Sequence, residues 1–183
     1  RPLSSFVAAL GFLGKDQRAF IEVARAQGIV WANAMRLPVG DECAEVVYAS
    51  HVLEHLDRTE AQLFLQEVKR VLVKGGWLRL AVPDLKRLVD EYLRDGDADT
   101  FVARTHLARP RPKNLAERLR YLIIGDRHHF WMYDAASLSV LLEEAGFVEV
   151  EILQPGKTRI PDPGPLNLYE RAEESIFAEA HKP

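Results

Sequence analysis

The clearest periodic pattern in the chain is a helical one over residues 59–72. Apolar side chains recur there at spacings of three and four residues, as on the buried face of a helix. Thr59 and Gln62 have the spacing of a capping box, and Gly75 and Gly76 predict the helix end. The pattern indicates an amphipathic helix whose buried positions are Ala61, Phe64, Leu65, Val68, Val71 and Leu72.

Short apolar runs stand on both sides of this helix, at residues 46–49 and 77–82. The first run does not alternate between apolar and polar residues, which is typical of a parallel strand covered on both faces. A strand, a helix and a second strand in this order predict a parallel pair with a right-handed crossover.

The rest of the chain continues the alternation of helices and strands, with one interruption at residues 97–133. We therefore expect a single α/β domain over residues 1–183, with 97–133 as a helical insertion or lid. Its ligands should lie beyond the carboxyl ends of the strands. The further predicted elements are a helix over 16–28, a strand over 29–32, a helix from Leu85 to Gly96, a short helix over 115–123, a helix from Asp134 to Gly146, and strands over 147–152 and 175–180.

The amino-acid composition limits the class of protein and its possible partners. The 183 residues are 48% hydrophobic and 28% charged, which suits one globular domain. The single cysteine, Cys43, excludes an intrachain disulfide and favours a reducing compartment, so we expect a cytoplasmic protein. A net charge of −3 and the lack of a long apolar run predict no nucleic-acid partner and no membrane partner. The oligomeric state stays open.

Residues 51–55, HVLEH, match H-x-x-E-H, the zinc signature of inverzincin peptidases. That chemistry needs a long helix with both histidines on one face. Here a strand ends at Ser50, so the context favours a short turn and we predict no metal ligand. His55 is expected to hold the turn through a backbone hydrogen bond. A zinc hydrolase using His51, Glu54 and His55 is the least favoured function.

Four longer segments resemble one known family. They are "MRLPVGDECAEVVYASHVLEHL", "EVKRVLVKGGWLRLAVPDL", "RHHFWMYDAASLSVLLEEAGF" and "LNLYERAEESIFAEAHKP". Together they are similar to the class I S-adenosylmethionine-dependent methyltransferases of the type-11 branch, over about residues 29–183. The resemblance implies a Rossmann-like fold with a mostly parallel sheet and an antiparallel last strand. It also implies S-adenosylmethionine as cofactor, and methyl transfer to an oxygen or nitrogen of a small molecule.

The resemblance also implies residues for the cofactor. Asn33 occupies the position of the family's adenine-binding acidic residue, and an amide can still bond the adenine edge. Ala34 and Met35 would line the adenine pocket. Ser50 and His51 follow the strand whose end passes the methionine part of the cofactor, so His51 is expected to face it.

One family feature has no counterpart in the sequence. The family's first strand ends in a glycine-rich loop, where the backbone approaches the cofactor closely. Gly11 and Gly14 lack the required spacing. We expect the loop to lie upstream of Arg1. If it has instead been lost, the chain is a catalytically inactive, methyltransferase-like binding module.

On the substrate side, His128 and His129 precede the last helix, where a histidine could accept a proton as a general base. Asp84 follows a predicted strand and could do the same, or could cap the next helix. The segment 97–133 is locally basic, which predicts an anionic substrate such as a phosphorylated or nucleotide-linked sugar, or else a solvated charged face.

Overall fold

The computed structural model describes residues 22, 26, 28–108, 114–115 and 128–183. The chain divides into two compact units, Arg1–Asn33 and Ala34–Pro183. In the first unit the described residues include helical positions at Glu22 and Ala26. The second unit contains the sheet and is described below. The expectation of a single domain over 1–183 stays a prediction.

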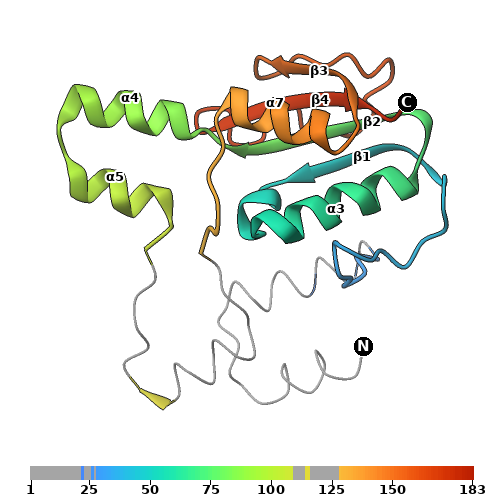
Figure 1. Ribbon diagram of the computed structural model, residues 1–183, viewed down its shortest axis with the longest axis horizontal. Coiled ribbons are helices and arrows are strands. Elements are labelled where there is room, and N and C mark those ends of the chain that lie inside the picture. Colours follow the sequence, from blue (N-terminus) through green and yellow to red (C-terminus); the bar gives the residue numbers. More distant parts are fainter. Residues whose placement is uncertain (1–21, 23–25, 27, 109–113, 116–127) are drawn as a thin grey trace. The chain divides into compact units, whose positions relative to one another are not determined.

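The second unit is built on a four-stranded sheet in the order β1-β2-β4-β3 (Figure 1). β1 and β2 are parallel, whereas β4 is antiparallel to both β2 and β3. The antiparallel last strand and the parallel first pair were both predicted. The strands are β1 (Ala44–Ser50), β2 (Leu72–Pro83), β3 (Val148–Leu153) and β4 (Ser175–His181).

Helix α3 (Arg58–Val71) connects β1 to β2. Its N-cap is Asp57, which forms a reciprocal capping box with Glu60, so the predicted box of Thr59 and Gln62 is wrong. The aspartate three residues before Glu60 competes successfully because its carboxylate accepts from the Glu60 amide at 2.8 Å. The helix ends directly at Leu72, which begins β2, so Gly75 and Gly76 lie within that strand.

Two helices follow β2: α4 (Leu85–Asp95) and α5 (Ala98–Thr105). Asp84 caps α4, and Gly96 ends it in the left-handed conformation at φ 71°. α5 was not predicted, since it buries only Thr105 and therefore shows no apolar stripe. Its local signal is Asp97, whose side chain accepts from the Thr100 amide.

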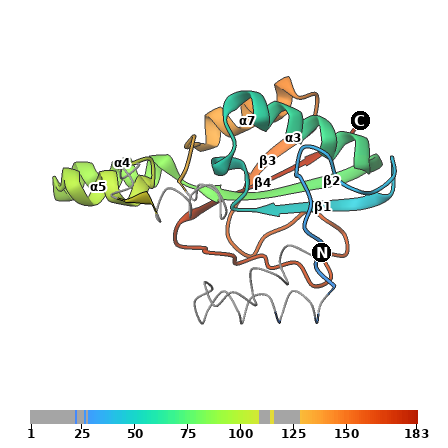
Figure 2. The same cartoon turned by 90° about the horizontal axis from the view of Figure 1, so that it is seen from below.

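The last helix, α7 (Ala135–Glu144), is capped by Asp134 as predicted. α3 and α7 lie on the same face of the sheet (Figure 2). The apolar core fills the space between these helices and the strands. Its fully buried members include Leu65, Val68, Leu78, Leu80, Tyr133, Leu138, Leu142 and Ala178.

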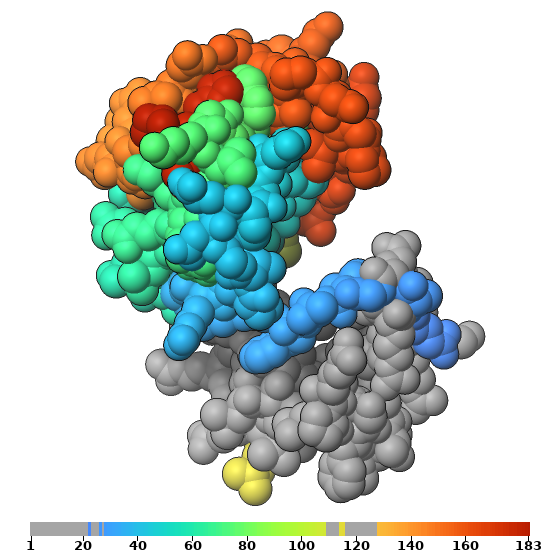
Figure 3. All heavy atoms as spheres, turned by 90° about the vertical axis from the view of Figure 1, so that its right-hand side faces the viewer, coloured from blue at the N-terminus to red at the C-terminus, as the bar shows by residue number. Residues whose placement is uncertain are grey.

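Two features fix the sheet at its centre and at one end. Arg79 of β2 and Glu179 of β4 are register partners, both fully buried, with Nη1 and Oε1 2.5 Å apart. At the end of the sheet, Lys182 Nζ donates to Glu42 and to the carbonyl of Leu72. Figure 3 shows this meeting of the cyan segment before β1, the green start of β2 and the red C-terminus.

Residues 29–32 do not form the predicted strand: they are irregular, and Trp31 is 93% exposed. Without a burial partner among the described residues, an apolar run of this length has nothing to stabilise it as a strand. Most of the predicted helices over 16–28 and 115–123 falls outside the described residues. Among the helices that the structure describes, none is both long and apolar enough for a membrane span.

Candidate functional site

The candidate site lies where β1 and β2 end side by side. Ser50 pairs with Ala81, and the His51 amide donates to the Ala81 carbonyl at 2.8 Å. His51 then adopts a left-handed conformation, with φ 52°, which reverses the chain direction. A single 3₁₀ turn, η1 (Leu53–His55), follows. The turn therefore sits at the carboxyl edge of the parallel pair, where the fold places ligand sites.

His51 is held between two partners. Its Nδ1 lies 3.0 Å from Glu54 Oε1, and its Nε2 lies 3.1 Å from Ser175 Oγ. Both ring nitrogens are thus engaged within the protein. His51 thus supports the turn, and its assignment to the cofactor stays a prediction.

The segment 128–133 is joined to this turn by backbone hydrogen bonds. The Phe130 amide donates to the Glu54 carbonyl at 2.7 Å, and the Leu85 amide donates to the Tyr133 carbonyl at 2.9 Å. His55 Nδ1 lies 3.1 Å from the His128 carbonyl oxygen. These bonds bring segments far apart in the sequence to one edge of the sheet.

A cavity of about 390 Å³ opens at this edge. Its size is within the range of small-molecule sites. Among the described residues, ten line it: His55, Pro83, Asp84, Arg87, Leu88, Arg104, His106, His129, Arg171 and Glu174. This lining includes three arginines and two carboxylates.

Two of these arginines also pair with nearby carboxylates. Arg87 contacts Glu91 and Glu173, and Arg104 contacts Glu91. Burial acts to lower the pKa of Arg87, but its hydrogen bonds to Glu173 and Glu91 outweigh this and raise the pKa. Both guanidinium groups are therefore held in place while charged.

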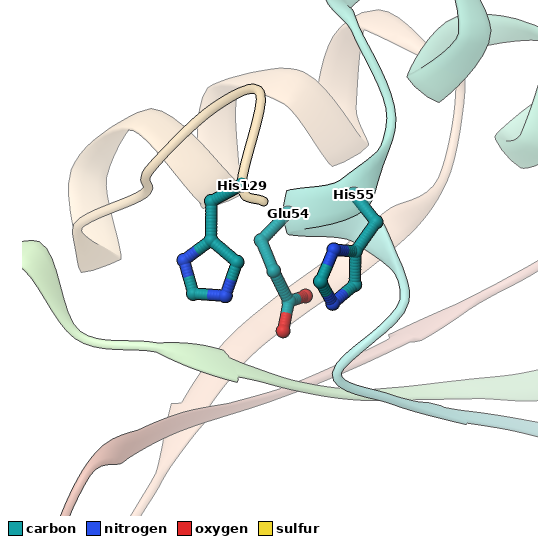
Figure 4. A group of neighbouring side chains, drawn as sticks. All are labelled: Glu54, His55 and His129. Atoms are coloured by element: carbon teal, nitrogen blue, oxygen red, sulfur yellow. The ribbon is translucent and has the colours of Figure 1, made fainter. Parts of the chain in front are cut away.

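Glu54, His55 and His129 form a second feature of the same edge. Each offers one ligand-type atom, and these atoms lie within 4.8 Å of one another. Figure 4 shows the Glu54 carboxylate between the two imidazole rings. Glu54 is fully buried. Burial lowers the pKa of His129 below its usual range, although the charge of Glu54 opposes the shift.

Of the predicted catalytic residues, the structure brings Asp84 and His129 to the cavity. Asp84 Oδ1 also accepts from the Arg87 amide at 3.3 Å, so Asp84 caps helix α4, which was the alternative prediction. His128 is half-buried, and its carbonyl oxygen is the hydrogen-bond partner of the His55 ring. His55 thus makes the backbone bond that was predicted, but to a distant segment instead of its own turn.

Of the predicted cofactor residues, Ala34 and Met35 are partly buried against the apolar core. Ser50 is half-buried at the end of β1, and Asn33 is exposed in the first unit. Gly11 and Gly14 lie outside the described residues.

The geometry removes the structural premise of the H-x-x-E-H zinc motif. Leu53–His55 is one 3₁₀ turn and not a long helix, and His51 is occupied by Glu54 and Ser175. Sequence reasoning also missed several lining residues. The sequence around Arg87 and around His106 does not mark either residue as part of a site. The cavity forms only because segment 128–133 is hydrogen-bonded to Glu54 and Leu85, which are distant in the sequence.

A family model described as "Methyltransferase domain" matches residues 12–80. No curated protein matches the chain.

Several solved structures are similar. A SAM-dependent methyltransferase of Thermotoga maritima, described as a possible histamine N-methyltransferase, is 19% identical with a TM-score of 0.51; the alignment covers 91% of this chain and 70% of that one. A protein of Pyrococcus horikoshii is 17% identical with a TM-score of 0.50, covering 98% and 76%. Human N-acetylserotonin methyltransferase, solved in complex with SAM, is 14% identical with a TM-score of 0.46, covering 84% and 33%. The first two likenesses concern the fold.

Proposed function

We propose that this chain is a class I S-adenosylmethionine-dependent methyltransferase of the type-11 branch, and that it methylates an oxygen or nitrogen of a small anionic molecule. The observation that supports this proposal is the cavity of about 390 Å³ beyond the carboxyl end of β2, whose lining includes three arginines. Both its place in the fold and its size suit a methyl acceptor.

The residues at the cofactor side fit the family's cofactor in part. Ala34 and Met35 would pack against adenine, and Ser50 would lie near the methionine end. When bound, S-adenosylmethionine supplies a methyl group on a sulfonium centre, whose thioether is a good leaving group. The protein then needs to bind, align and shield the acceptor more than to activate it.

We assign separate roles, anion binding and proton acceptance, to the residues that line the cavity. Arg87, Arg104 and Arg171 would bind the anionic part of the acceptor, because a guanidinium matches phosphate and carboxylate geometry. A phosphorylated or nucleotide-linked sugar has that chemistry. Asp84 would accept the proton that an oxygen or nitrogen nucleophile loses on methylation.

Asp84 can take this role without releasing its helix. The cap uses Oδ1, and an ionised carboxylate has two oxygens that accept hydrogen bonds. His128 and His129 were the other proton-acceptor candidates. His129 lines the cavity beside Glu54, which gives it a different role, argued below.

Two further parts of the proposal rest on the composition. An exposed free thiol at Cys43 supports a reducing, cytoplasmic location. The net charge of −3 supports a small-molecule acceptor instead of a nucleic acid or a membrane surface.

Calorimetric titration of the full-length protein with S-adenosylhomocysteine tests the proposal, followed by an acceptor panel in its presence. The panel pairs phosphorylated and nucleotide-linked sugars with their neutral counterparts. We expect 1:1 binding of S-adenosylhomocysteine and selective binding of the anionic member of a pair. No heat at millimolar S-adenosylhomocysteine would contradict the proposal. Binding of S-adenosylhomocysteine without binding of any acceptor would favour the inactive binding module.

A further inference from the structure

The Glu54 side chain is fully buried at the edge of the sheet, yet only half of its carboxylate has a protein partner. Oε1 bonds His51, whereas Oε2 has no hydrogen-bond partner among the described residues. A buried carboxylate oxygen without a partner costs free energy, so such an atom calls for a ligand. Figure 4 shows what the carboxylate lies between: the rings of His55 and His129.

His55 is oriented for coordination. Its Nδ1 lies 3.1 Å from the His128 carbonyl, which can only accept, so Nδ1 carries the proton and Nε2 keeps its lone pair. A metal-bound histidine usually donates its second nitrogen to a carbonyl in this way, which fixes the ring. The His128 carbonyl therefore has the place of an outer-shell partner.

His129 completes the group from a distant part of the chain. Its amide donates to the His106 carbonyl at 3.0 Å, and the next amide, that of Phe130, donates to the Glu54 carbonyl. These two bonds hold the His129 backbone against the turn.

We propose that Glu54, His55 and His129 bind a divalent transition-metal ion. Two imidazoles and one carboxylate form the ligand set of three-ligand zinc sites that keep one position open. Imidazole nitrogen suits zinc and similar transition-metal ions, whereas magnesium, calcium and manganese prefer oxygen ligands. This ligand set differs from the H-x-x-E-H motif, because His51 supports the carboxylate and His129 replaces it.

The distances require a small adjustment. Ligand atoms about 2.1 Å from a tetrahedral ion are roughly 3.4 Å apart, whereas those of the three residues lie within 4.8 Å of one another. Inward rotation of the two half-buried imidazoles closes this difference. Glu54 needs no movement, since it is already fixed by His51.

The open position would face the cavity. His55 and His129 both line it, whereas Glu54 is fully buried. An oxygen of the acceptor could bind the ion there, which would lower its pKa and fix its orientation. This consequence rests on the proposed function, whereas metal binding itself does not.

The test is a titration of the chelator-treated, full-length protein with Zn²⁺, Co²⁺ and Mg²⁺, without cofactor or acceptor. We expect one Zn²⁺ and one Co²⁺ per chain, a higher melting temperature with either ion, and a visible absorption band from four- or five-coordinate Co²⁺. Millimolar Mg²⁺ should not displace them. A Zn²⁺ stoichiometry near zero, or Mg²⁺ displacing Zn²⁺, would overturn the proposal.

Variants separate this site from chance binding by surface histidines. His129→Asn and Glu54→Gln should each weaken Zn²⁺ binding at least about tenfold and abolish the Co²⁺ band. The control is His181→Asn, since the His181 ring contacts Trp77 and does not line the cavity; the Zn²⁺ affinity of this variant should equal that of the wild type. Equal loss in the control, or unchanged affinity in His129→Asn, would overturn the assignment. Circular dichroism of the metal-free variants confirms folding, and His129→Asn decides the matter if Glu54→Gln unfolds.

The metal titration needs no enzymatic turnover, so its outcome is independent of the test of the proposed function. A protein that binds Zn²⁺ through His129 but never binds S-adenosylhomocysteine would keep the metal site and lose the methyltransferase proposal. A protein that binds S-adenosylhomocysteine but no Zn²⁺ would keep the methyltransferase proposal and lose the metal site.

Discussion

His51 Nε2 and Ser175 Oγ lie 3.1 Å apart, although 124 positions separate the two residues in the chain. The bond ties the turn after β1 to the first residue of β4. Since His51 also bonds Glu54, the buried carboxylate is anchored to the sheet through His51. The hydrogen bonds of His51 to Glu54 and Ser175 therefore hold the turn of the candidate site against the sheet.

Removing this brace should cost stability. Ser175→Ala leaves a half-buried imidazole nitrogen without its partner, so we expect the free energy of unfolding to fall by about 1 kcal/mol. Urea denaturation measures it. Ser139→Ala is the matched control, because Ser139 bonds its own helix at an exposed position, and it should change stability by less than about 0.5 kcal/mol. Equal effects of the two substitutions would show that the brace contributes nothing.

The buried pair of Arg79 and Glu179 predicts strong non-additivity. Glu179 also accepts from Thr158 Oγ1 and the Arg159 amide, so its charge is well satisfied. Arg79→Met leaves that carboxylate without its cation and should cost about 3–5 kcal/mol. The double substitution Arg79→Met with Glu179→Leu should cost less than the sum of the single ones. A double-mutant cycle in denaturant measures the coupling, and additive costs would contradict it.

Stability should fall in acid partly through Glu67. Its hydrogen bonds with Arg70 outweigh the effect of burial and, with the Leu37 amide, lower the pKa of Glu67 to about 2. A lowered pKa in the folded state means stability that is present above the unfolded value of 4.5 and lost as pH falls towards 2. Glu67→Gln should flatten this part of the profile of unfolding free energy against pH. Glu143→Gln, at an exposed position of α7, should leave the profile as in the wild type.

Asp84 allows catalysis to be separated from helix capping. Asparagine caps helices about as well as aspartate, so Asp84→Asn should keep the melting temperature. Loss of the proton acceptor should lower kcat by about 10²–10⁴-fold. Asp134→Asn is the same substitution at the cap of α7, away from the cavity lining, and should keep kcat. A kcat unchanged in Asp84→Asn would remove it from the mechanism.

The regular elements could largely be predicted because their signals are local. The apolar stripe of α3, the Asp134 cap and the run at 77–82 each lie within one segment. α5 escaped prediction because it buries almost nothing.

The candidate site could be predicted only in part, because its assembly is not local. The periodicity around Glu54 and around His129 carries no sign that Phe130 bonds the Glu54 carbonyl. Asp84 and His129 were found by their positions after a strand and before a helix. The pairing of His129 with Glu54 and His55 needed the tertiary structure.

The most direct test of the central claim is methyl transfer by the full-length protein from S-adenosylmethionine labelled in its methyl group. The label is followed into paired anionic and neutral acceptors. We expect labelled anionic product formed in equal amount with S-adenosylhomocysteine, and far less product from the neutral counterpart. A protein that binds S-adenosylhomocysteine yet labels no acceptor, or labels the neutral members preferentially, would contradict it.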